Sequence, residues 1–315
     1  MTEAEKRRRS MPSGGQFHYH ERPDGTKLRY GIWQSKTVSK RGSMIILPGA
    51  SEFIEKYYEI VNELLERDFS VIILDWRGQG LSSRPLKNRQ KHHYESFDSL
   101  VFDLDSLVNL WHDGNAPKPL HILAHSMGGH VTLRYLHDFP EKVESAILTA
   151  PMVDVYYAGM PVWFVKALNG LMGLLGRSTA YAPMQGDFDL EGGGNYKMEQ
   201  LTSDPERFED EFYQIDQNKD LIIGGKTFGW LRAAMASIDI LNAEGYGEAI
   251  KTPVTVVQCS EDKLVRNDRQ EIMAKRIPEV KFHIVEGSKH EILKERDVYR
   301  KQFWKIFDDA YGTST

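Results

Sequence analysis

Hydrophobic positions along the chain form two alternating patterns. Short apolar runs rich in β-branched residues indicate strands, and between them apolar residues spaced three and four positions apart indicate amphipathic helices. Several strands are apolar almost throughout, which is typical of a mostly parallel sheet with helices on both faces. The predicted strands are residues 28–33, 44–47, 70–74, 120–124, 145–149, 254–258 and 281–285, and the predicted helices are 56–67, 97–111, 127–138, 269–276 and 298–310.

The alternation stops after Thr149 and resumes at Val254. A helical block inserted there would leave the sheet intact and lie over the carboxyl ends of its strands, where open α/β sheets bind ligands. We call this block the cap. Its predicted parts are an apolar stretch at residues 160–175, a turn at Gly192, Gly193 and Gly194, and helices over residues 204–215 and 227–238.

This pattern predicts one catalytic domain with an insertion rather than two independent units. We expect a flexible N-terminal tail at residues 1–16, a first part of the core at 17–152, the cap at 153–245 and a second part of the core at 246–315. A chain of 315 residues is long enough to bury a sizeable core in this arrangement.

Charge and cysteine content exclude several classes of function. The 40 basic and 45 acidic side chains give a net charge of -5, so we expect no nucleic-acid partner. The single cysteine, Cys259, excludes an internal disulfide and a multi-cysteine metal cluster. No window approaches the ~20 apolar residues that a membrane-spanning helix needs. The basic run at residues 6–9 has no apolar stretch behind it, so we predict no secretory signal and a cytoplasmic protein.

The strongest chemical signal is the segment HILAHSMGGH, which begins at His121. An apolar strand runs directly into Ser126, and a helical pattern starts at once. The small residues Ala124 and Gly128, two before and two after, relieve crowding at such a turn, which is the layout of a nucleophile elbow. The same turn places the backbone N–H of Met127 at a helix start, where it is directed at whatever binds beside the serine.

A serine nucleophile needs a base and an orienting carboxylate, and two later strands end in these residue types. Asp262 follows the strand at 254–258, and His290 follows the strand at 281–285, in the chain order Ser, Asp, His. Glu261 remains a competitor for the carboxylate. Asp262 is favoured because it stands one step before the chain turns back into a helix.

The second donor to an oxyanion is expected in the loop PGASE, residues 48–52, which follows the strand at 44–47. Its small residues let the backbone approach a substrate oxygen, and the Ala50 N–H is the best candidate. The loop DWRGQGLS, residues 75–82, is expected to brace the site, with Arg77 buried beside it as an ion-pair partner. The pair His121 and His125 lacks a carboxylate, so it supports a metal site only weakly, and we expect no metal or organic cofactor.

Together these segments resemble the lysophospholipase L2 and monoacylglycerol lipase group of α/β-hydrolases. The resemblance rests on LPGASE, DWRGQGLSS, the run HYESFD, ILAHSMGG, LTAPM, LTSDPERF, GGKTFGWL and GSKHEILKE. It implies an α/β-hydrolase fold with a mostly parallel eight-stranded sheet and a cap after the sixth strand. It also implies that Ser126 is the nucleophile, His290 the base and Asp262 its orienter, with the Ala50 and Met127 amides as the oxyanion hole. One departure is Pro48, because monoacylglycerol lipases usually carry His before the glycine of this loop.

The expected substrate is an ester of a single-chain lipid, a lysophospholipid or a monoacylglycerol. The apolar stretch at 160–175 must face the core, an acyl-chain tunnel or a membrane surface, and these alternatives stay open. Transient contact with the inner membrane surface would use this stretch or the basic tail. A short-chain carboxylesterase or thioesterase would use the same triad. A peptidase would need an amine-binding carboxylate in the cap, for which Glu191 and Glu209 are candidates.

Overall fold

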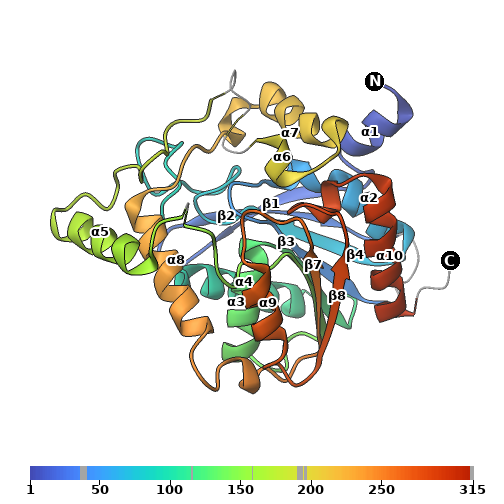
Figure 1. Cartoon of the computed structure of the whole chain (residues 1–315). Helices are drawn as coiled ribbons and strands as arrows, with labels where there is room; N and C mark the ends of the chain where they lie inside the picture. Colours follow the sequence, from blue (N-terminus) through green and yellow to red (C-terminus); the bar gives the residue numbers. More distant parts are fainter. Residues whose placement is uncertain (36–40, 115, 158, 190–193, 195–196, 313–315) are drawn as a thin grey trace.

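The protein is built around one twisted sheet of eight strands (Figure 1). The computed structural model describes residues 1–35, 41–114, 116–157, 159–189, 194 and 197–312. Along the sheet the strands follow the order β1-β2-β4-β3-β5-β6-β7-β8. Pairs β1–β2 and β2–β4 are antiparallel, and all other neighbours are parallel. The strands are β1 (Gln16–Glu21), β2 (Lys27–Trp33), β3 (Ser43–Leu47), β4 (Ser70–Leu74), β5 (Leu120–His125), β6 (Ser145–Thr149), β7 (Val254–Cys259) and β8 (Val280–Val285).

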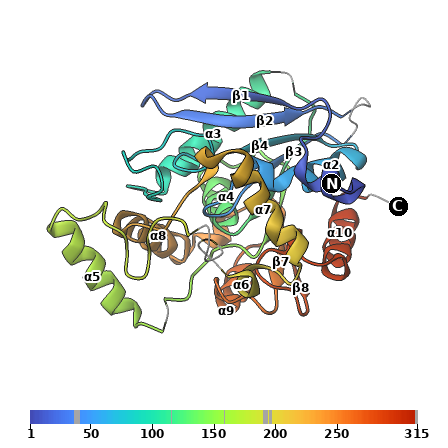
Figure 2. The same ribbon diagram turned by 90° about the horizontal axis from the view of Figure 1, so that it is seen from above.

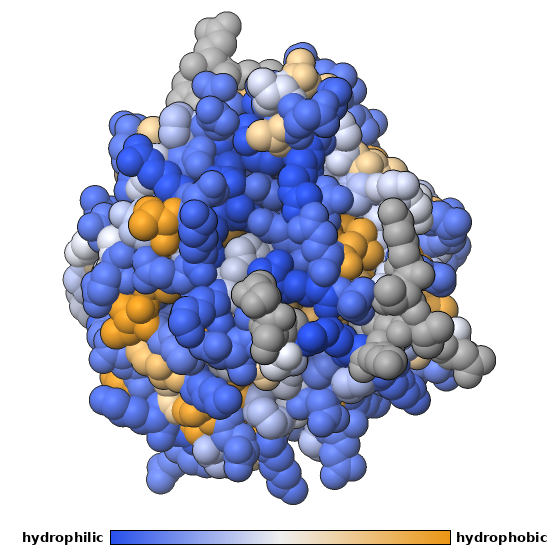
Figure 3. Space-filling view, turned by 90° about the vertical axis from the view of Figure 1, so that its right-hand side faces the viewer, coloured by the Kyte–Doolittle hydropathy of each residue, from blue (hydrophilic) through white to orange (hydrophobic). Residues whose placement is uncertain are grey.

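The predicted mostly parallel, eight-stranded α/β sheet is therefore confirmed. Every residue of β3, β4 and β5 is buried, because helices cover both faces of the sheet. Helices α2 (Tyr58–Glu66) and α10 (Asp297–Tyr311) lie on one face (Figures 1 and 2). The other face carries α3 (Asp98–Asp113), α4 (Met127–Asp138) and α9 (Asn267–Ala274). The outer surface over α2 and α10 is mainly hydrophilic, with small scattered apolar patches (Figure 3).

Between β6 and β7 the described residues form only helices and loops. The helices are α5 (Val162–Leu174), α6 (Met198–Leu201), α7 (Pro205–Gln217) and α8 (Phe228–Leu241). Two short 3₁₀ helices, Lys219–Leu221 and Gly247–Ala249, also lie in this segment, and two more lie outside it, at Ile54–Tyr57 and Ile292–Lys294. Gly194 adopts a positive φ of 81°, as a glycine turn requires, whereas Gly192, Gly193 and Glu191 lie outside the described residues. The boundaries of the cap stay a prediction.

Helix α5 lies within the apolar stretch at residues 160–175, and most of this helix does not pack in the core. Within the helix only Val165 and Asn169 are buried, on the side that contacts α8. Trp163 is 71% exposed and Leu174 is 89% exposed. The sequence left open whether this helix faces the core, an acyl-chain tunnel or a membrane surface. Core packing accounts for only one narrow stripe of it. None of the helices among the described residues is long and apolar enough to cross a membrane.

The N-terminal segment differs from the flexible tail that we expected. Residues Glu3–Arg9 form helix α1, which begins with a capping box because the Thr2 hydroxyl accepts a hydrogen bond from the Glu5 N–H. Arg8 is buried, and its Nε donates to Asp210 on α7 at 2.8 Å. Arg7 pairs with Glu66 on α2 at 2.5 Å. The sequence placed the basic run in a flexible tail because its acidic partners are remote along the chain.

The parallel strands bring four loops to one edge of the sheet. Strands β3, β5, β7 and β8 run in the same direction, so their carboxyl ends lie at the same edge. The loops that follow them carry Ala50, Ser126, Asp262 and His290 respectively. Chain segments more than a hundred residues apart are thereby placed beside one another.

Candidate active site

Ser126 occupies a strained turn between β5 and α4. Its φ of 50° with ψ of -113° is unfavourable for a residue that carries a Cβ, and such strain is typical of a nucleophile elbow. The turn is tight because a Cβ at Gly128 would lie 2.3 Å from the backbone oxygen of Leu47. Glycine is therefore required there. Ala124, where the motif more often has glycine, is fully buried within β5.

The three side chains predicted as a triad lie within hydrogen-bonding distance. His290 Nε2 is 3.0 Å from Ser126 Oγ, and His290 Nδ1 is 2.6 Å from Asp262 Oδ2. The other carboxylate oxygen of Asp262 accepts hydrogen bonds from the backbone N–H groups of Leu264 and Val265 at 2.8 and 3.1 Å. Glu261, the competing carboxylate, is exposed to solvent.

This arrangement shifts the pKa values of both His290 and Asp262. Burial alone would lower the pKa of His290, but the Coulomb attraction and hydrogen bond of Asp262 outweigh it and hold the pKa above the ordinary 6.5. Burial would raise the pKa of Asp262, yet His290 and the two backbone donors outweigh it and lower that pKa. The carboxylate is therefore charged at neutral pH, and the proton on Nδ1 leaves Nε2 free to accept a proton from Ser126.

The raised pKa of His290 predicts where activity is lost in acid. The imidazole acts as a base only when it is neutral, so kcat/KM must rise as pH increases through the pKa of His290 in the free enzyme. We expect the midpoint of this acid limb above pH 6.5 in a pH–rate profile with an uncharged ester. His283→Gln, which changes an imidazole on β8, should leave the midpoint unchanged. A wild-type midpoint below 6.5 would mean that burial outweighs Asp262 and would contradict this prediction.

Two backbone N–H groups near Ser126 are the candidates for the oxyanion hole. Met127 is the first residue of α4, so its N–H has no partner inside the helix. Ala50 lies in the loop after β3, and within the described part of the chain no hydrogen bond from its N–H is found. Ala50 lines the same cavity as Ser126, and Met127 directly follows Ser126 in the chain, so their role as an oxyanion hole stays a prediction.

A cavity of about 210 Å³ opens beside the serine. Ala50, Ser126 and His290 line one part of it. No residue of α5, which is described in full, contributes to the lining, so the apolar wall comes from elsewhere in the chain. That wall includes Met152, Val155, Leu201, Phe208, Phe212, Trp230, Leu231 and Leu264.

The cavity also has a charged end that the sequence did not reveal. Lys56 Nζ lies 2.7 Å from Glu291, 2.9 Å from Glu52 and 3.1 Å from Glu211. Burial opposes the charge on Glu52, but Lys56 and His125 outweigh it and lower its pKa to about 2. Burial and the neighbouring carboxylates raise the pKa of Glu211. Glu52 lies in the loop before the 3₁₀ helix at Ile54–Tyr57, so no helical spacing marked this cluster in the sequence.

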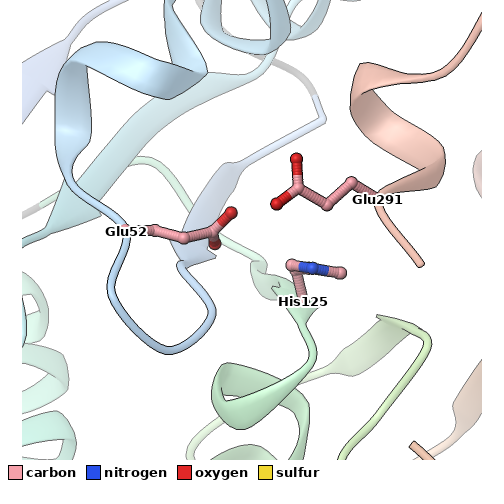
Figure 4. A group of neighbouring side chains, drawn as sticks. All are labelled: Glu52, His125 and Glu291. Carbon is pink, nitrogen blue, oxygen red and sulfur yellow. The ribbon is translucent and has the colours of Figure 1, made fainter. Parts of the chain in front are cut away.

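Three members of this region could together hold a cation. Glu52, His125 and Glu291 point toward one another, and their ligand atoms lie within 4.8 Å of each other (Figure 4). The Lys56 ammonium already contacts both carboxylates and would repel a metal ion. We therefore assign no metal to this cluster. His121 does not belong to it, because it lies at the start of β5, where its Nδ1 is 2.9 Å from the Oγ of Ser145, the first residue of β6.

The loop at residues 75–82 contacts the site as expected, but through other residues than Arg77. Arg77 forms an ion pair with Asp103 at 2.6 Å, and it does not line the cavity. Gln79 and Trp76 of this loop bind the Ala50 loop instead, both with fully buried side chains. The ion pair of Arg77 was thus predicted from the sequence, but this side chain is half-buried rather than buried, and the side chains that brace the site were missed.

Comparison with known proteins places this geometry in context. A family model described as serine aminopeptidase, S33, matches residues 38–297. The lysophospholipase L2 of Escherichia coli strain K12 is 28% identical over 273 residues, which cover 82% of this chain and 76% of that protein. The probable lysophospholipase L2 of Haemophilus influenzae is 25% identical over 279 residues, covering 89% and 86%. A solved monoglyceride lipase of Saccharomyces cerevisiae, a soluble variant with a substrate analogue, aligns with a TM-score of 0.75 at 18% identity and covers 96% of this chain and 97% of its own.

Proposed function

This chain belongs to the serine aminopeptidase S33 family, and we propose that within it the protein is a carboxylic ester hydrolase that cleaves the acyl ester of single-chain lipids. The observation that carries the proposal is the hydrogen-bonded series Ser126, His290 and Asp262 at the wall of a largely apolar cavity. Relatives named lysophospholipase L2, and a solved monoglyceride lipase with the same fold, support the choice of substrate class.

The proposed reaction has two halves joined by an acyl-enzyme. Ser126 Oγ attacks the ester carbonyl while His290 Nε2 takes its proton, and Asp262 stabilises the imidazolium that forms. The oxyanion accepts hydrogen bonds from the Ala50 and Met127 amides, each worth on the order of 3 kcal/mol of barrier. When the tetrahedral intermediate collapses, His290 gives its proton to the departing alcohol. A water molecule then reverses these steps and releases the fatty acid.

Two other functions fit the same triad less well. A short-chain carboxylesterase or thioesterase would need a tighter pocket than one walled by Phe208, Phe212 and Trp230. An aminopeptidase needs a free carboxylate for the substrate amine. Glu209 is exposed and does not line the cavity, and Glu191 lies outside the described residues. Glu211 does line the cavity, but Lys56 already occupies the position that an amine would take.

Hydrolysis across acyl lengths tests the proposal. With one head group and acyl chains from acetyl to palmitoyl, we expect kcat/KM to rise by at least about tenfold between acetyl and decanoyl, because each buried methylene contributes about 0.8 kcal/mol. Aminoacyl p-nitroanilides serve as the comparison and should not be cleaved. A maximum at acetyl or butyryl would favour the short-chain esterase, and preferred cleavage of the anilides would favour the peptidase.

Contact with a lipid surface belongs to this proposal as well. The exposed apolar side chains of α5, with Trp163 and Leu174 among them, support transient docking of that helix on a membrane. The basic run of α1 is a weaker candidate, because Arg7 and Arg8 are already in ion pairs with Glu66 and Asp210. Vesicle co-sedimentation that is unaffected by Trp163→Ser would count against α5.

A further inference from the structure

The loop at residues 75–82, which we call the brace loop, holds the loop at residues 48–52, the oxyanion loop, from both ends. Trp76 Nε1 donates a hydrogen bond to the Pro48 carbonyl oxygen at 2.8 Å. At the far end, Asp75 Oδ1 accepts from the Ile54 N–H at 2.9 Å. Both side chains are fully buried, so neither bond has water as a competitor. The brace loop therefore fixes the two flanks of the oxyanion loop.

Gln79 binds the middle of the oxyanion loop with every part of its carboxamide. Its Nε2 donates to the backbone oxygens of Gly49 at 3.0 Å and Glu52 at 2.9 Å. Its Oε1 accepts from the Ser51 N–H at 3.0 Å. The side chain is wholly buried. One residue thus satisfies three backbone groups that would otherwise be buried without partners.

The glycines on either side of Gln79 are what direct it there. Gly78 and Gly80 both have positive φ, of 78° and 49°. A Cβ at Gly80 would lie 2.1 Å from the Asp75 carboxyl carbon, so no larger residue fits. The G-x-G spacing, which resembles part of a phosphate-binding motif, here forms a tight turn around one buried amide.

These bonds bind the backbone groups on both sides of Ala50 and leave its own N–H free of them. The Gly49 carbonyl on one side and the Ser51 N–H on the other are both bound by Gln79, and the Gly49 N–H donates to the Glu52 carboxylate. Ser51 has a φ of 66°, a strained conformation that must be held by its surroundings. The Ala50 N–H is left without a partner among the described residues, and Ala50 lines the cavity beside Ser126.

We propose that Gln79 is a positioning residue for the oxyanion hole: its carboxamide holds the Gly49–Ser51 backbone so that the Ala50 N–H faces the substrate carbonyl oxygen. The inference rests on the proposed hydrolase function. A primary amide is required because it supplies an acceptor and two donors from one planar group. A glutamate would keep the shape but lose the donors and place a charge against the Gly49 and Glu52 carbonyl oxygens. A methionine would keep the volume and leave all three backbone groups unpaired.

The test separates transition-state stabilisation from folding. In Gln79→Met and Gln79→Glu we expect kcat on the preferred acyl ester to fall by about 10- to 100-fold, with KM within about twofold, because a displaced donor acts only on the oxyanion. A trifluoromethyl ketone of matching chain length, which forms a tetrahedral oxyanion with the serine, should lose affinity by a similar factor. The corresponding secondary alcohol, which cannot form this adduct, should bind unchanged.

The matched control is Arg77→Met in the same brace loop. Its guanidinium pairs with Asp103 rather than with the oxyanion loop, so this variant should keep kcat within about twofold even if its melting temperature falls. Circular dichroism establishes the fold of each variant, and Gln79→Asn, which keeps the amide but shortens its reach, replaces Gln79→Met if that protein does not fold. An unchanged kcat in a folded Gln79 variant, or a reduced kcat with undiminished ketone affinity, would overturn the inference. A wild type inactive on every acyl ester would overturn the proposed function and this inference together.

Discussion

Replacing Ser126 with alanine is expected to lower kcat for ester hydrolysis by about four orders of magnitude or more. The variant removes the hydroxyl that lies 3.0 Å from His290 Nε2, so no acyl-enzyme can form there. Some catalysis over water should remain, because the Ala50 and Met127 amides still stabilise an oxyanion formed by attacking water. The loss of a small hydroxyl at a strained turn should leave the fold intact, so the effect falls on kcat.

Initial rates on a long-chain acyl ester measure this loss, with circular dichroism as the check on folding. Ser99→Ala is the matched control, because this hydroxyl donates a hydrogen bond to the Ser96 backbone oxygen just before α3 and does not line the cavity. It should retain wild-type rates. Full esterase activity in Ser126→Ala would mean that the chain either uses another nucleophile or does not catalyse the reaction at this site.

Asp262→Asn is expected to lower kcat by about three to four orders of magnitude. The carboxylate accepts the Nδ1 proton of His290 at 2.6 Å, whereas an asparagine amide in its place donates a hydrogen to Nδ1. The imidazole then carries its proton on Nε2 and cannot take one from Ser126. The same change removes the charge that holds the pKa of His290 above 6.5, so residual activity should persist to lower pH than in the wild type.

The neighbouring residue supplies the control for this second experiment. Glu261→Gln changes an exposed carboxylate one position earlier, and we expect kcat within about twofold of the wild type. Steady-state rates for both variants across pH 5 to 9 decide between them. A large loss of kcat in Glu261→Gln with little loss in Asp262→Asn would show that Glu261, and not Asp262, orients His290.

Seven of the eight strands and the predicted triad were accessible from the sequence because they depend on local patterns, whereas β1 was not among the predicted strands. Continuous apolar runs such as those of β3 and β4 identify strands buried on both faces. Ser126 was recognised from its strand, its turn and its flanking small residues. Asp262 and His290 followed from a topological fact, namely that carboxyl ends of parallel strands meet at one edge.

The features that were missed depend on contacts between distant segments. Lys56 binds Glu211 and Glu291 across 155 and 235 residues, and neither partner is marked by spacing or motif. Gln79 looked like an ordinary loop residue because backbone acceptors carry no sequence signal. Arg8 was assigned to a flexible tail because Asp210, its buried partner, lies 202 residues away. The hydrophobic pattern also did not predict that α5 would expose most of its apolar surface.

Intact-protein mass spectrometry after reaction with a fluorophosphonate tests most directly whether Ser126 is the nucleophile, since this reagent labels activated serines covalently. We predict a single phosphonate adduct per chain, mapped by peptide sequencing to Ser126 and absent from the folded Ser126→Ala protein. An adduct on a different residue, or equal labelling of the wild type and Ser126→Ala, would contradict the assignment of the active site.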